Sequence, residues 1–152
     1  NYHEALLKSM LSVGYLMPGR NILISSGPSR SKIELLNSAR MLRDRGYSLF
    51  ATEGTHKFLA ENGVENTLLH WPDEEDRHPN CAGFLKSRKI DLVINIPKNY
   101  TKRELRNGYF IRRTAIDFNI PLITNARVAS SFVHSICRYQ PENLAIKSWD
   151  EY

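Results

Sequence analysis

Thr52 and Thr55 enclose a Glu-Gly pair at the junction of a predicted strand and a predicted helix. Residues 49–51 are typical of a buried strand, and residues 57–61 have the apolar spacing of a helix. A glycine lets the backbone approach a ligand closely, and the free N–H groups of a first helical turn attract anions. The turn therefore predicts a small anion-binding site. The alternative is that a threonine here only caps the helix, which is its commoner role.

Polar or aromatic side chains stand at other positions where they could contact a ligand. Asn95 lies within the apolar run 90–96, and a buried amide needs hydrogen-bond partners. Lys32 opens a predicted helix after a loop rich in Ser, Gly and Pro, where it would either contact an anion or lie in solvent. Trp71 precedes Pro72 and would form either a flat wall against a ligand or ordinary core packing.

No catalytic constellation is visible in the sequence. There is no Ser-His-Asp order with an elbow motif, no Walker lysine loop and no G-x-G-x-x-G, and the histidines lack ligand spacing. The acidic run 73–76 could hold a cation, although such loops are commonly only solvated. Arg112 and Arg113 are neighbours on a predicted helix, so at most one faces a given site. One of them is expected to pair with a carboxylate such as Asp117.

The order of elements predicts an α/β sandwich with a mainly parallel sheet of about five strands, because strands and helices alternate through short connections. Ligands of such sheets bind at the carboxyl ends of the strands, where polar residues such as Ser25, Ser26, Thr52 and Asn95 recur. The expected strands are 21–25, 47–51, 67–71, 90–96 and 121–125, and the expected helices are 32–45, 57–62, 81–89, 107–119 and 127–138.

Composition narrows the possible classes of function. A chain of 152 residues is long enough for one domain with its own core, and it has no apolar run that could cross a membrane. Cys81 and Cys137 are far apart, which favours reduced thiols, and no signal peptide is visible. A net charge of +5 favours anionic small molecules at least as much as nucleic acid, and no aromatic and basic stripe is present. The helical rhythm of residues 1–11 indicates a piece of a longer protein.

Five motifs occur in a characteristic order: Ala-Thr-Glu-Gly-Thr at 51–55, Trp-Pro at 71–72, Asp-Leu-Val-Ile-Asn-Ile-Pro at 91–97, Tyr-Phe-Ile-Arg-Arg-Thr-Ala at 109–115 and Ile-Pro-Leu-Ile-Thr-Asn at 120–125. Together they resemble the methylglyoxal-synthase-like domain, and more narrowly the C-terminal regulatory domain of the carbamoyl-phosphate synthetase large chain. The resemblance covers residues 4–138. It implies a linker helix from the preceding domain at 1–18, an effector-binding domain at 19–140 and a tail at 141–152.

The resemblance also implies a Rossmann-like three-layer sandwich with its effector site at the strand ends. Thr52 and Thr55 match the two threonines that hold the phosphate or carboxylate of the effector in this family. Asn95 matches the asparagine at the end of the fourth strand. Lys32 falls where many members have a basic contact, although the length of the preceding loop varies.

Two further matches concern the identity of the effector. Trp71 matches the tryptophan of members that respond to N-acetylglutamate. Asn107 matches a further asparagine in those members, although this chain is one residue longer before Arg112. Trp71 and Asn95 thus favour N-acetylglutamate, whereas the basic Lys32 at the start of a predicted helix keeps a nucleotide monophosphate such as UMP or IMP as an alternative, so the effector stays open.

Methylglyoxal synthases have a Gly-Gly-Asp-Gln-Gln loop after the third strand and an aspartate after the fourth. This chain instead has Trp-Pro-Asp-Glu-Glu-Asp at 71–76 and Asn-Ile-Pro-Lys at 95–98. The catalytic carboxylates are therefore missing from their expected places, although Asp73 could substitute. The resemblance thus implies a non-catalytic domain, and the alternatives are a free-standing lyase of the methylglyoxal synthase type and a basic domain that binds nucleic acid.

The expected function is allosteric control of carbamoyl-phosphate synthase, the ATP-dependent ligase at the head of arginine and pyrimidine biosynthesis. No cofactor or metal is expected in this domain, whereas the parent enzyme would use ATP, Mg²⁺ or Mn²⁺, and bicarbonate. The expected partners are an anionic effector, the remainder of the large chain and a glutaminase subunit, without nucleic acid or membrane. The expected compartment is the cytoplasm, or the mitochondrial matrix for a urea-cycle-type enzyme.

Overall fold

The computed structural model describes residue 5 and residues 19–27, 29–97 and 101–138. Ala5 is helical and exposed, and the rest of the predicted linker helix at 1–18 lies outside the described residues. The predicted tail at 141–152 lies outside them as well. Within the described part of the chain, no helix is long and apolar enough to cross a membrane.

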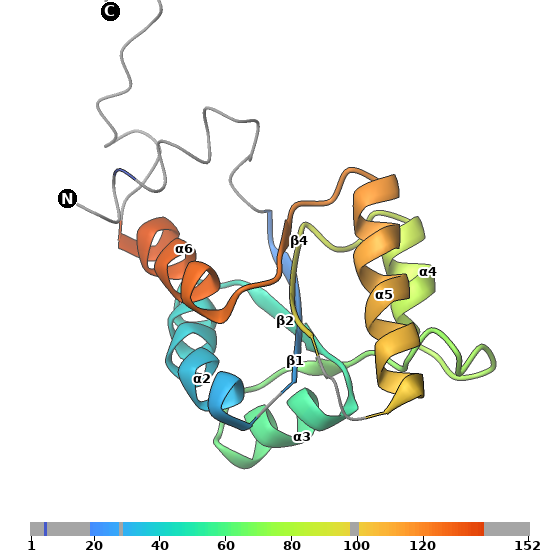
Figure 1. Ribbon diagram of the computed structural model, residues 1–152. Helices are drawn as coiled ribbons and strands as arrows, with labels where there is room; N and C mark the ends of the chain where they lie inside the picture. Colours follow the sequence, from blue (N-terminus) through green and yellow to red (C-terminus); the bar gives the residue numbers. More distant parts are fainter. Residues whose placement is uncertain (1–4, 6–18, 28, 98–100, 139–152) are drawn as a thin grey trace, which may run out of the picture.

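Five parallel strands form one sheet in the order β3-β2-β1-β4-β5 (Figure 1). The chain first moves outward from β1 to β3 and then crosses to β4 on the other side of β1, so the strand order reverses between β1 and β4. Such a reversal is where parallel α/β sheets bind ligands. The strands are β1 (Asn21–Ser26), β2 (Ser48–Ala51), β3 (Thr67–Leu68), β4 (Leu92–Ile96) and β5 (Leu122–Ile123).

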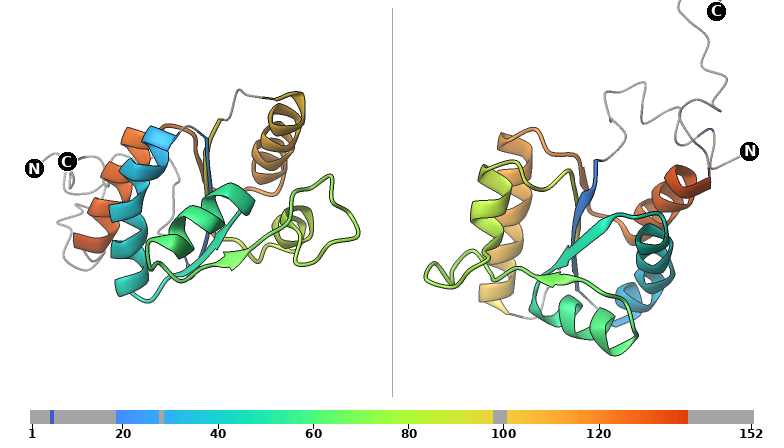
Figure 2. Two further views of the ribbon diagram at one scale, coloured as in Figure 1. Left: turned by 90° about the horizontal axis from the view of Figure 1, so that it is seen from below. Right: turned by 180° about the vertical axis from the view of Figure 1, so that it is seen from behind.

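Helices cover both faces of the sheet, which explains why the strands are apolar on both sides (Figure 2). Buried side chains of α2, α3 and α6 pack on one face, and those of α4 and α5 pack on the other. The helices are α2 (Ser29–Asp44), α3 (Glu53–Glu61), α4 (Cys81–Lys86), α5 (Lys102–Asp117) and α6 (Ala126–Arg138).

The alternation of side chains along the central strands determines which way the polar strand ends point. Ile24 belongs to the core cluster under α2, α3 and α6, and Val93 belongs to the cluster under α4 and α5. Because residues two apart in a strand share a face, Ser26 points toward the first group of helices and Asn95 toward the second. Ser25 pairs with Asn95 in the register of β1 and β4. The carboxyl edge of the sheet therefore carries hydroxyl and amide groups on both faces.

The predicted fold class is confirmed, and the boundaries of several predicted elements were wrong. α3 begins at Glu53 and α5 at Lys102, earlier than the expected 57 and 107. α2 begins at Ser29, so Lys32 is the fourth residue of the helix rather than the first. These first turns are polar and lack the apolar spacing that marks a helix in a sequence, which is why the prediction started each helix too late. β3 is likewise shorter than expected.

Candidate functional site

The amino end of α3 lacks the side-chain cap that its sequence suggests. Thr52 is at the N-cap position with φ −74° and ψ 162°, yet within the described residues its side chain makes no capping hydrogen bond. Its Oγ1 instead donates to Ser25 Oγ at 2.8 Å. By contrast, Asn80 and Thr101 cap α4 and α5 with their own side chains, at 2.8 and 3.0 Å. The backbone N–H groups in the first turn of α3 therefore receive no hydrogen bond acceptor from the side chain of Thr52.

Thr55 fastens the same turn to the end of β1. Its Oγ1 accepts the Ser26 backbone N–H at 3.0 Å and donates to the Ser26 carbonyl oxygen at 3.4 Å. Thr52 and Thr55 are buried, with exposed fractions of 0% and 2%. The two hydroxyl hydrogens are thus directed at β1, and the threonines hold the turn against the strand.

The hydroxyls of Ser25 and Ser26 remain able to donate a hydrogen bond to a ligand, whereas those of the two threonines are directed at β1. Ser26 is fully buried, and its Oγ has no hydrogen-bond partner among the residues that the structure describes. A buried hydroxyl without a partner costs about 1–3 kcal/mol, so a group that bonds to it there is favoured. Ser25 accepts from Thr52 and therefore keeps its own O–H for donation. The sequence signal for this pair is two serines at the end of an apolar strand.

Asn95 is buried at 2% exposure, and its amide contacts α5. Its Oδ1 accepts a hydrogen bond from Arg112 Nη1 at 2.7 Å. Arg113 forms an ion pair with Asp117, with 3.3 Å between Nε and Oδ1. The prediction that one of the two arginines pairs with Asp117 is confirmed, and the other one, Arg112, contacts Asn95.

Trp71 and Asn107 are both buried, and they are engaged in core packing and internal hydrogen bonds. Trp71 is 7% exposed and belongs to the core cluster under α4 and α5. The Asn107 Oδ1 accepts the Asp73 backbone N–H at 3.1 Å, and its Nδ2 donates to the Arg103 carbonyl at 3.1 Å. Asn107 therefore braces the loop that follows Trp71. An effector contact by either residue stays a prediction.

The acidic run that could have held a cation is involved in ion pairs. Arg103 donates to both carboxylate oxygens of Asp73, at 2.7 and 3.0 Å, and these hydrogen bonds lower the pKa of Asp73. Glu74 contacts Arg77 at 3.3 Å. The described residues contain no group of three His, Cys, Asp or Glu side chains that could hold a metal ion. The geometry thus favours a salt-bridged loop.

Lys32 lies in the first turn of α2 and is half-buried. Within the described part of the chain it makes no hydrogen bond or ion pair. The structure therefore does not connect Lys32 to Thr52, Thr55 or Asn95, and its contact with an anion stays a prediction.

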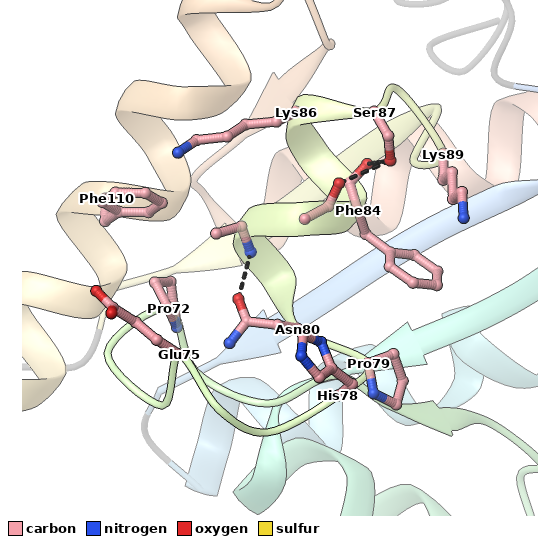
Figure 3. Close-up of a pocket in the computed structure, with 12 residues that line it drawn as sticks. Pro72, Glu75, His78, Pro79, Asn80, Phe84, Lys86, Ser87, Lys89 and Phe110 are labelled. Atoms are coloured by element: carbon pink, nitrogen blue, oxygen red, sulfur yellow. Dashed lines mark hydrogen bonds between the residues drawn. The ribbon is translucent and has the colours of Figure 1, made fainter.

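A hollow of about 750 Å³ lies elsewhere, between α4, the loop at 72–80 and Phe110 of α5 (Figure 3). The Lys86 Nζ lies 5.5 Å from the centre of the Phe110 ring, and the Lys89 Nζ lies 5.2 Å from that of Phe84. None of the six predicted site residues lines this hollow. We assign the candidate site to the carboxyl edge of the sheet, because buried polar residues stand at the carboxyl ends of β1 and β4 and are joined to the first turn of α3 through Thr52 and Thr55.

The model of the MGS-like domain family matches residues 34–124 of this sequence. The chain belongs to the MGS-like domain family. Three similar relatives are multifunctional protein pyr1-3 of Dictyostelium discoideum (44% identical over 138 residues, covering 88% of this chain and 6% of the relative), mitochondrial carbamoyl-phosphate synthase [ammonia] of Homo sapiens (40% over 137 residues, 88% and 9%) and multifunctional protein CAD of Squalus acanthias (38% over 149 residues, 90% and 7%).

This MGS-like domain spans less than a tenth of the length of those three relatives. Among solved structures it is similar to the methylglyoxal synthase from Elizabethkingia anophelis NUHP1, with a TM-score of 0.56, 19% identity, and coverage of 90% of this chain and 91% of that one. At that identity the likeness shows the fold alone. The family and fold expected from the five sequence motifs are both confirmed.

Proposed function

We propose that this MGS-like domain is the effector-binding regulatory domain of a carbamoyl-phosphate synthase. The human relative is named carbamoyl-phosphate synthase, and this chain covers only 9% of it, which supports a part within a larger chain. The proposed parent enzyme makes carbamoyl phosphate from bicarbonate, ATP and ammonia for arginine or pyrimidine biosynthesis. The rest of the large chain and a glutaminase subunit are its proposed partners.

One observation carries the proposed anion site. The first turn of α3 has no cap from Thr52, and the buried Ser26 Oγ beside it has no partner among the described residues. A helix amino terminus stabilises a negative charge by about 0.3–1 kcal/mol, and more in partly buried geometries. A phosphate or carboxylate at this edge would accept from the turn and from the serine hydroxyls. Thr52 and Thr55 would contribute by holding the turn in position.

Regulation requires that the anion bind two arrangements of the synthase with different affinity, since a ligand shifts an equilibrium only by that difference. α5 is suited to transmit such a difference. Its Arg112 contacts Asn95 at the sheet edge, and its Asn107 and Arg103 contact the loop at Asp73. A displacement of Asn95 on ligand binding would therefore move α5, and α5 is also hydrogen-bonded to the loop at Asp73.

The alternative function, a lyase of the methylglyoxal synthase type, needs a carboxylate that can take a proton from substrate. Asp73 is the proposed substitute, but both its oxygens accept from Arg103 and its pKa is lowered. A carboxylate in that state is a weaker base at neutral pH. We therefore propose that the domain is non-catalytic. Formation of methylglyoxal from dihydroxyacetone phosphate by the purified chain would overturn this.

A thermal-shift and calorimetric screen against UMP, IMP, ornithine and N-acetylglutamate tests the proposed function. An effector at 100 times its dissociation constant stabilises the folded state by about 2.7 kcal/mol, a rise in melting temperature of about 5–10 °C for a domain of this size. Thr52→Ala should abolish that rise without unfolding the chain. Ser135→Ala on α6, which loses a part-buried hydrogen bond of 2.8 Å to the Ser131 carbonyl of the same helix, should keep it.

Two outcomes would overturn the assignment. If Thr52→Ala binds every ligand as tightly as the parent chain, the site is elsewhere. If the chain instead binds polyanions with steep salt dependence and without small-molecule preference, it is a nucleic-acid-binding domain.

A further inference from the structure

The contact between Arg112 and Asn95 determines how the Asn95 amide is oriented. The Arg112 Nη1 lies 2.7 Å from the Asn95 Oδ1, and Asn95 is 2% exposed. A guanidinium has only donors, so the amide atom that faces it must be the oxygen. The NH₂ group of Asn95 is therefore on the side of the amide that does not face Arg112. An asparagine that could otherwise present either a donor or an acceptor is restricted to presenting a donor.

We propose that Arg112 is a positioning residue, which holds the Asn95 amide so that its NH₂ group is offered to an anion at the carboxyl edge of the sheet. This inference rests on the proposed function, because it supposes an anion at that edge. Asn95 stands beside Ser25 in the sheet register, so the amide and the serine hydroxyl form a pair of donors on neighbouring strands. Together they select a ligand that only accepts, such as a carboxylate or phosphate.

Gly108 provides the space that this arrangement needs. It is buried on α5, one turn before Arg112. A Cβ at Gly108 would lie 3.0 Å from the Arg112 Nη1, which is closer than ordinary van der Waals contact. The guanidinium therefore lies over the glycine, and a methyl group there would move it by a few tenths of an ångström. The hydrogen bond to Asn95 would lengthen accordingly.

The competing interpretation is that Arg112 merely ties α5 to β4. Asn95→Asp separates the two, because an aspartate still accepts from Arg112 but presents a carboxylate oxygen where the NH₂ group was. We expect Asn95→Asp in the 152-residue chain to fold, and to bind N-acetylglutamate and UMP at least 10-fold more weakly than the parent chain. A tenfold loss of affinity corresponds to about 1.4 kcal/mol. The loss is larger if a full charge-assisted hydrogen bond to the anion is removed. Unchanged affinity would overturn the proposal and leave the proposed function intact.

If the parent chain binds neither N-acetylglutamate nor UMP nor any other tested anion, the proposed function and this inference both fall. A ligand-free experiment tests the holding contact by itself. Asn95→Asp should lower the melting temperature more when Arg112 is replaced by Met than when Arg112 is present, because only the arginine compensates the buried carboxylate. Arg113→Met is the matched control, since Arg113 is on the same helix but pairs with Asp117. Equal losses with and without Arg112 would overturn the inference.

Gly108→Ala adds a steric test that does not remove any polar group. Alanine favours a helix over glycine, so the variant should fold with an equal or higher melting temperature. Its affinity for the anion should nevertheless fall several-fold, because Arg112 is displaced. Gly83→Ala on α4 is the control, because a Cβ there meets nothing within 4 Å. If Gly108→Ala and Gly83→Ala have the same affinity as the parent chain, Arg112 does not position the site.

Discussion

The hydrogen bond between Thr52 and Ser25 makes a quantitative prediction about stability. Thr52→Val removes the hydroxyl and keeps the shape of the side chain. The bond is 2.8 Å long and joins a side chain that is 0% exposed to one that is 2% exposed. Removing it should cost about 1–2 kcal/mol, because Ser25 then loses its partner in a buried place. For a domain of about 150 residues this lowers the melting temperature by about 2–8 °C.

The physical cause can be isolated by a double-mutant cycle measured with urea denaturation. If the cost comes from the bond to Ser25, then Thr52→Val and Ser25→Ala should be non-additive, with a coupling of about 1 kcal/mol. Thr101→Val is the matched control, because Thr101 caps α5 through its own side chain at 3.0 Å and should be additive with Ser25→Ala. Additivity of Thr52→Val and Ser25→Ala would refute the reasoning, since it would mean that Thr52 stabilises the chain as an ordinary cap.

Other parts of the structure make three further predictions. Burial raises the pKa of the Cys81 thiol to about 12 from 9.0, so native Cys81 should resist iodoacetamide at pH 8, and the free energy of unfolding should fall as pH rises from 9 to 12. Rapid labelling of the folded chain would contradict this. Phe132→Ala should cost about 3–5 kcal/mol in urea denaturation, because Phe132 is 1% exposed in the core. The hydrogen bonds from Arg103 lower the pKa of Asp73, so this pairing stabilises the fold at pH values above the ordinary pKa of 3.8. The difference in melting temperature between the parent chain and Asp73→Asn should therefore shrink as the pH falls below 3.8. A difference that stays constant with pH would count against the pairing.

The sheet could be predicted from the sequence because its signal is local. Runs such as 90–96 are apolar on both faces, and they alternate with segments of helical spacing, which together indicate a parallel sheet covered on both sides. The starts of α3 and α5 could not be found in the same way. Their first turns are polar, so only the extended residue before each one, Thr52 or Thr101, marks the beginning.

The sequence predicted where the candidate site lies in the fold, but it did not predict which residues contact one another there. Polar residues at strand ends identify the carboxyl edge, because parallel strands all end on the same side. Which partner each residue takes depends on packing between elements. Arg112 is 17 residues from Asn95, and Asn107 bonds to a loop 34 residues away. The spacing of four residues favours an ion pair between Arg113 and Asp117, which is a local signal. The contact of Arg112 with Asn95 has no such signal, because it depends on the rotation of α5 against β4.

Ser26→Ala tests the central claim most directly, because it predicts opposite effects on stability and on binding. Isothermal titration of N-acetylglutamate, UMP and IMP into the parent chain and the variant measures the binding, and thermal unfolding measures the stability. The Ser26 hydroxyl has no partner among the described residues, so its removal should leave the melting temperature unchanged or raise it. Affinity for the anion that the parent chain binds should fall about 10-fold, the loss of roughly 1.4 kcal/mol. A variant that melts at a lower temperature and binds the anion as tightly as the parent chain would contradict an anion site at this edge of the sheet.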